Sequence, residues 1–188
     1  MIRRTSLAVV TTVVLLLSGA TAAQTHAAPM QTALRSSTTA HAGGGIGALR
    51  HAATKFRNLQ RAENAGYGFF TDTAGIACIA MPGMGAMGVH FVNSTLVGDP
   101  TEQVRHPEAM VYRIDDKGVL RLAAAEYVVI ASAWDATHAK RPQLFGHRFM
   151  LTPAGNRYGL PAFYSLHAWA WYHNPAGRFA MWNPRVTC

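Results

Sequence analysis

Four side chains of the types that bind metal ions fall in segments with the alternating pattern of β-strands: His90, Glu108, Glu126 and His167. Alternate residues of a strand share one face, so the pattern places Glu126 beside Val128 and Ile130 on the more aliphatic face of 119–130. A lone carboxylate buried there would cost too much free energy to stay ionised. Glu126 must therefore be paired, protonated or bound to a metal.

The same alternation gives His90, Glu108 and His167 apolar neighbours on their own strands. Inward-facing residues of neighbouring strands converge inside a barrel or jelly roll, so ligands far apart in sequence can meet. Two imidazoles and two carboxylates suit a divalent transition metal such as Zn, Mn, Fe or Cu. The pattern predicts such a site. The alternative is a structural cluster in which backbone, Tyr or Arg groups satisfy the buried His and Glu.

A second candidate metal site is rich in methionine. Three thioethers recur at every third residue ahead of His90, at Met81, Met84 and Met87. Soft thioether ligands suit cuprous copper, which a protein outside the cytoplasm can meet. The alternative is that these flexible side chains fill gaps where a glycine-rich loop enters a strand.

The N-terminus has the layout of an export signal. Arg3 and Arg4 precede an apolar run over 7–17, and small residues follow over 18–22. We therefore predict a signal peptide over 1–22 and a secreted or extracytoplasmic protein. The apolar run is too short to span a bilayer, and we expect no transmembrane segment in the mature chain.

Cys78 and Cys188 are the only cysteines of the chain. In an oxidising compartment, two thiols so far apart in sequence are expected to form one disulfide. The bond would tie the C-terminal residue to the start of the folded core.

The formal net charge of +8 falls to +6 in the mature chain, because the leader carries Arg3 and Arg4 and no acid. The remaining basic residues are scattered among strand and turn signals and form no run, a pattern that argues against nucleic acid as a partner. The composition is compatible with a small-molecule ligand. The sequence does not determine the oligomeric state.

The elements that must position these residues follow from periodicity. Residues 23–47 are rich in Ala, Thr, Ser and Gly and lack aromatic residues, so we predict a flexible linker. Helical spacing from Leu49 to Ala65 predicts one N-terminal amphipathic helix. The period then changes to two between turn residues, which predicts strands over 76–81, 87–93, 108–114, 119–130, 145–151, 162–173 and 178–182.

These elements predict a single globular, mainly β domain over 48–188. Short alternating strands joined by turn residues close on themselves to hide their edges. We therefore expect an antiparallel β-sandwich or barrel, jelly-roll-like, with the N-terminal helix covering one end or edge.

Several segments between 78 and 188 form a specific set: Met87–Asn93, Pro107–Tyr112, Leu120–Leu122 with Glu126–Tyr127, Leu144–Gly146, Leu166–Trp171 and Asn174–Cys188. On these segments the chain resembles a family of small uncharacterised secreted bacterial proteins. The family's pattern carries His90, Glu108, Glu126 and His167, and Phe163 stands where related sequences often have His. The resemblance implies export and the domain boundaries, and it implies no reaction.

Two functions are compatible with the sequence. The first is a secreted β-rich domain that binds a divalent metal through the four predicted ligands, with hydrolytic or oxygen chemistry at an open coordination position. The second is a non-enzymatic extracytoplasmic module, structural or ligand-binding, with no metal. The sequence alone does not say whether the protein is an enzyme.

Overall fold

The computed structural model describes residues 45–188. The predicted signal peptide over 1–22, and the predicted linker up to residue 44, lie outside the described residues. Within 45–188 the chain contains no helix that is both long enough and apolar enough to cross a membrane.

The N-terminal part of this range forms three short helical segments: α1 (Ile46–Ala53), the 3-10 helix η1 (Thr54–Arg57) and α2 (Leu59–Glu63). The single helix predicted from Leu49 to Ala65 is therefore interrupted. Asn58 has an extended backbone (φ −87°, ψ 110°), and its side chain accepts a hydrogen bond from the backbone N–H of Arg61. Asn58 thus caps α2 instead of continuing a helix.

The strands form one seven-stranded antiparallel sheet in the order β1-β3-β4-β5-β9-β8, and β2 pairs with β3 off this path. Their bounds are β1 Gly68–Phe69, β2 Cys78–Met81, β3 Gly85–Val92, β4 Ala109–Ile114, β5 Leu120–Ile130, β8 Met150–Thr152 and β9 Phe163–Ala168. A separate two-stranded sheet pairs β6 (Gln143–Leu144) with β7 (His147–Arg148). Two further short helices are α3 (Ser94–Val97) and α4 (Ala131–Asp135).

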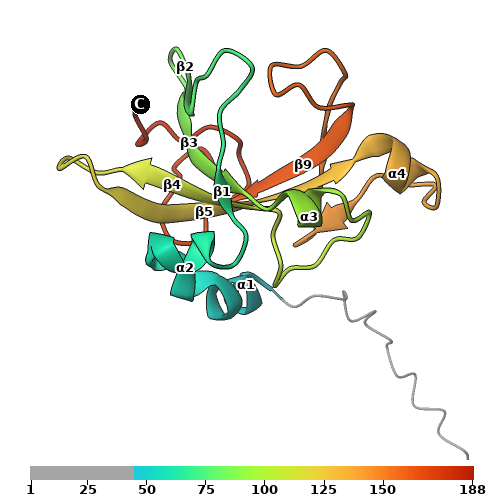
Figure 1. The fold of residues 1–188 in the computed structure, drawn as a ribbon, viewed down its shortest axis with the longest axis horizontal. Helices are drawn as coiled ribbons and strands as arrows, with labels where there is room; N and C mark the ends of the chain where they lie inside the picture. The colour runs from blue at the N-terminus through green and yellow to red at the C-terminus, as the bar shows by residue number, and fades with distance from the viewer. Residues whose placement is uncertain (1–44) are drawn as a thin grey trace, which may run out of the picture. The chain divides into compact units, whose positions relative to one another are not determined.

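One face of the large sheet packs on the helices. Tyr112 of β4 and Tyr127 of β5 are fully buried on this face, and the Tyr112 hydroxyl donates a 2.7 Å hydrogen bond to the Phe56 carbonyl of η1. Figure 1 shows α1 and α2 beneath the sheet, with the β2–β3 hairpin rising from the other side. The main core lies between sheet and helices, and includes Leu49, Phe56, Phe91, Met110, Tyr112, Tyr127 and Leu166.

The mainly antiparallel β class is confirmed, whereas the sandwich or barrel is not. The sheet is not closed. In a sandwich, a second sheet would bury one face of this sheet. Here helices cover that face, so the sheet can stay open and still bury its apolar side chains. The strand predicted over 178–182 is wrong: those residues contain a turn at 178–179 and no strand, and the next residue, Asn183, makes a single antiparallel bridge to Ala86.

The predicted disulfide is present between Cys78 and Cys188, with Cα atoms 5.6 Å apart. It joins the first residue of β2 to the C-terminal residue. The bridge between Ala86 and Asn183 pairs the closing segment with β3, on the opposite side of β3 from β2, because Ala86 also pairs with Ala80 of β2. The last residues are therefore fixed beside the β2–β3 hairpin.

Candidate metal centre

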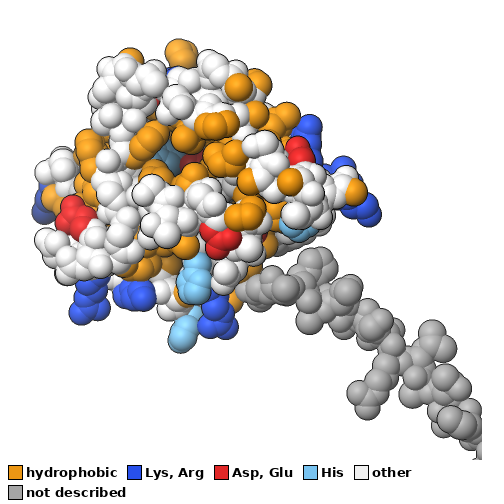
Figure 2. All heavy atoms as spheres, turned by 45° about the vertical axis from the view of Figure 1, so that its right-hand side comes forward, with side chains coloured by type: hydrophobic (Ala, Val, Ile, Leu, Met, Phe, Trp, Pro, Cys, Tyr) orange, Lys and Arg blue, Asp and Glu red, His pale blue; other side chains and the backbone are white. Residues whose placement is uncertain are grey.

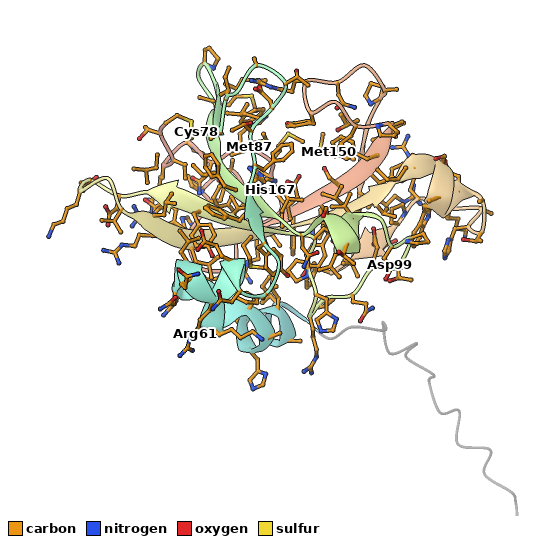
Figure 3. All side chains as sticks on the ribbon, viewed as in Figure 1. Arg61, Cys78, Met87, Asp99, Met150 and His167 are labelled. Carbon is orange, nitrogen blue, oxygen red and sulfur yellow. A yellow bond between two sulfur atoms is a disulfide. The ribbon has the colours of Figure 1, made fainter. Side chains whose placement is uncertain are left out.

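Three of the four predicted ligands meet in one cluster. His90 comes from β3, Glu126 from β5 and His167 from β9, and one ligand atom of each lies within 4.8 Å of the others. His90 Nε2 is 3.0 Å from Glu126 Oε2, and His167 Nδ1 is 3.5 Å from Glu126 Oε1. One imidazole therefore faces each oxygen of the carboxylate. Figure 3 shows His167 in the middle of the sheet, on the side away from Arg61 of α2.

Strand register explains this convergence. Glu126 and His167 are direct partners in the β5–β9 pair. Ala109 of β4 is the partner of Glu126 on one side and of Val92 on the other. Because His90 is two residues from Val92, it shares the same sheet face. The short side chain of Ala109 leaves room for His90 to reach Glu126 across β4.

The cluster is largely buried, and His167 lacks hydrogen bonds. The side chains of His90, Glu126 and His167 are 9%, 13% and 1% exposed. Neither ring nitrogen of His167 has a hydrogen-bond partner, since the 3.5 Å approach to Glu126 does not form one. Buried polar atoms are nearly always satisfied, and leaving one unpaired costs about 1–3 kcal/mol. An ion in the cluster would satisfy one of these nitrogens.

Glu126 has the charge that a metal site requires. Burial raises the pKa of the Glu126 carboxyl, but the imidazoles of His167 and His90 together outweigh burial and hold that pKa well below its usual range. The carboxylate is therefore ionised at neutral pH. In a tetrahedral site with bonds near 2.0–2.1 Å, ligand atoms lie about 3.3 Å apart. The separations from His90 to Glu126 Oε2 and from His167 to Glu126 Oε1, 3.0 and 3.5 Å, are close to that value, although each imidazole faces a different oxygen of the carboxylate.

The cluster opens into a cavity of about 450 Å³ on the face of the sheet opposite α1 and α2, and Ser94 and Val97 of α3 line part of it. His90 and Glu126 line it, together with Ser165 and apolar side chains. In Figure 2 a hollow rimmed by hydrophobic side chains has histidine and acidic atoms at its bottom. A group bound to the cluster would therefore be in contact with this cavity.

Met87 lines the same cavity although regular alternation would put it on the opposite face from His90. The register of β2 with β3 shifts at this point, so that Met87 is an extra residue, and the adjacent Gly88 has φ +98°. A β-bulge of this kind re-aims side chains. Met81 and Met84 are 42% and 48% exposed whereas Met87 is 3% exposed. The soft-metal loop stays a prediction.

Glu108 lies apart from the cluster. It precedes β4, is 2% exposed, and its Oε2 accepts a 3.0 Å hydrogen bond from the backbone N–H of Val128. Burial raises the pKa of Glu108 to about 8, against the lowering effect of that hydrogen bond. Pairing of β4 with β5 begins only at Ala109, so the Val128 N–H has no strand acceptor there and the Glu108 carboxylate supplies one. The Pro107 carbonyl instead accepts a 2.8 Å hydrogen bond from the Tyr67 hydroxyl.

A contact that sequence analysis did not predict joins the two loops beside the cavity. Asp72 Oδ2 accepts a 2.8 Å hydrogen bond from Arg157 Nε, and the backbone N–H of Thr73 donates to the Arg157 carbonyl at 2.9 Å. The first loop carries Phe70, and the second carries Tyr158, both of which line the cavity. The partners are 85 residues apart, so no local pattern links them.

Comparison of the chain with protein-family models, with curated proteins and with solved structures finds no match. The resemblance to small secreted bacterial proteins therefore stays a prediction. A function has to be inferred from the geometry and chemistry of the site itself.

Proposed function

We propose that this protein is an extracytoplasmic β-rich domain that binds one divalent transition metal through His90, Glu126 and His167. The observation that carries the proposal is the pair of unpartnered ring nitrogens of His167, buried against an ionised carboxylate. The Cys78–Cys188 disulfide supports an oxidising compartment.

The donor set favours Zn, Mn, Fe or Cu over the hard cations Ca and Mg, because two of its three donors are imidazole nitrogens. Three protein ligands are the number found in catalytic zinc sites, where the fourth position is left to water or substrate. Such a metal supplies Lewis acidity or activates a bound water, so hydrolytic chemistry or oxygen chemistry at the open position is the enzymatic form of this proposal. The role of His90 and Glu126 would be to hold that open position toward the cavity.

The second candidate is a ligand-binding module without a metal. The cavity supports it, since about 450 Å³ is within the range of small-molecule sites. In that case the His90–Glu126 contact would be a structural pair that also fixes the polar end of a ligand.

Metal content separates the two candidates. Protein purified without a metal-affinity tag is dialysed against Zn²⁺, desalted and measured by elemental analysis. We expect about one zinc per chain, and almost none for His167→Ala. Two matched controls keep the metal: His51→Ala changes an exposed histidine of α1, and Glu108→Gln changes a buried carboxyl outside the cluster. Equal zinc in His167→Ala and wild-type protein, or none in either, would contradict the proposal.

A further inference from the structure

The cavity next to the cluster has mostly apolar walls. They come from the sheet face, from the segment that follows β1, from α3 and from the loop before β9; the main apolar residues are Phe69, Phe70, Ile79, Val128, Leu160 and Phe163. Phe69 and Ile76 belong to the lining and are nevertheless 61% and 44% exposed. Large apolar side chains left open at a concave site indicate a surface that an apolar group covers.

The lining carries almost no charge. His90, Glu126 and Tyr158 are its titratable residues, and it contains no Lys, Arg or Asp. Burial raises the pKa of Tyr158 to about 12, so this hydroxyl stays neutral. The walls therefore offer no cation to an anionic ligand, and in the absence of a metal the ionised Glu126 repels one.

A metal in the cluster reverses this preference. A divalent cation and the single Glu126 carboxylate leave one positive charge facing an apolar cavity. Uncompensated charge in such surroundings is costly, and one monoanionic oxygen donor brings the site to neutrality. A donor of this kind also fits the open coordination position that three protein ligands leave.

We infer that the site binds an amphiphilic monocarboxylate, with its carboxylate on the metal and its apolar body in the cavity lined by Phe69, Phe70 and Phe163. This inference rests on the proposed metal site. An amphiphilic monocarboxylate would be the substrate if the protein is an enzyme, and the bound ligand if it is not. The head is recognised by the metal that His90, Glu126 and His167 hold, and the body by apolar contact alone.

Calorimetry with decanoate as the probe tests the inference. Zinc-loaded protein, desalted to remove free zinc, and metal-free protein are titrated separately with decanoate, with 1-decanol and with acetate. We expect decanoate to bind the zinc-loaded protein at least about tenfold more tightly than the metal-free protein, a difference of about 1.4 kcal/mol. Decanol lacks the anionic head and acetate lacks the apolar body, so both should bind at least about tenfold more weakly than decanoate.

A variant at the cavity rim tests decanoate binding without changing a metal ligand. Ile76→Ser should weaken decanoate binding severalfold without changing zinc content, because Ile76 lines the cavity and is no ligand. Ile114→Ser is the matched control, since Ile114 is an exposed apolar residue outside the lining. Zinc bound at one per chain with no decanoate binding, or with equal decanoate affinity in the two states, overturns the inference alone. Failure to bind zinc overturns the proposed function and the inference together.

Discussion

Glu126 and His167 face each other directly across the β5–β9 pair, and Glu126 Oε1 lies 3.5 Å from His167 Nδ1. Side chains opposite each other on one sheet face are natural contact partners. A slip of one residue in this register would turn one of the two away from the other. The cluster is therefore a property of strand pairing, and His90 joins it across β4 from the same face.

Replacing Glu126 tests whether its charge is paired. We expect Glu126→Leu to lower the free energy of unfolding of metal-free protein by about 2 kcal/mol, because the buried His90 Nε2 loses its partner. Urea unfolding at pH 7 measures this. Glu63→Leu, at an exposed position of α2, should change stability by less than about 0.5 kcal/mol. A neutral or stabilising Glu126→Leu would mean that the carboxyl is protonated and isolated.

The bulge at Met87 and Gly88 should tolerate no side chain at Gly88. A Cβ there would lie 2.7 Å from the Tyr112 carbonyl oxygen, and φ is +98°. We expect Gly88→Ala to lower the free energy of unfolding by more than about 2 kcal/mol. Gly118→Ala is the control, since Gly118 also has positive φ (+74°) but no atom within 4 Å of its added Cβ. Equal losses in the two variants would show that the close approach of β4 is unimportant.

Loss of the disulfide should be among the largest single changes. The bond closes a loop of 110 residues. In the chain-entropy model such a closure stabilises the fold by about 5 kcal/mol. The double variant Cys78→Ala/Cys188→Ala should therefore unfold at a much lower urea concentration than the oxidised wild type. Coincident unfolding curves would contradict this assignment.

Glu108 makes stability depend on pH. Burial raises its pKa from 4.5 to about 8, so between these values the folded chain keeps a proton that the unfolded chain has lost. The free energy of unfolding must then fall as the pH rises from about 4.5 to about 8. Glu108→Gln removes this pH-dependent loss of stability, because glutamine does not titrate. Its amide oxygen can still accept the hydrogen bond from the backbone N–H of Val128.

The melting temperature of metal-free protein from pH 5 to pH 9 checks this. The Glu108→Gln variant should gain on the wild type as the pH rises to about 8, and the difference should level off above that pH. Glu102 has its pKa raised to about 8, by burial and by Glu108, so the two carboxyls titrate as a pair. Glu63→Gln, with an exposed carboxyl, should melt in parallel with the wild type at every pH. The same parallel behaviour in Glu108→Gln would refute the assignment.

Alternation was enough to predict that His90, Glu126 and His167 each lie on an apolar face of their own strand, because a period of two is a local property. It could not say which face the helices would cover. Glu108 shares the strand face of Met110, which packs in the main core on the helix side, whereas its neighbour Ala109 is the partner of Glu126. No local pattern aligns β4 with β5, and the prediction therefore places Glu108 with the other three residues.

Alternation also does not reveal the irregularities in the strands. The β4–β5 register shifts near Val111, and as a result Leu122 packs in the main core on the helix side, although simple alternation gives it the face of Glu126. Asn58 similarly interrupts a helix that apolar spacing alone would continue. Such features depend on contacts between distant segments, which a local pattern does not contain.

The most direct measurement is a crystal structure of the protein grown with zinc, with anomalous diffraction data collected at the zinc absorption edge. We predict one strong anomalous peak between β3, β5 and β9, bonded to His90, Glu126 and His167 at about 2.0–2.2 Å. In Glu126→Gln crystals grown in the same way, the peak should weaken greatly or vanish. Wild-type crystals with zinc only on surface histidines, and with Glu126 still in direct contact with His90, would contradict the metal site.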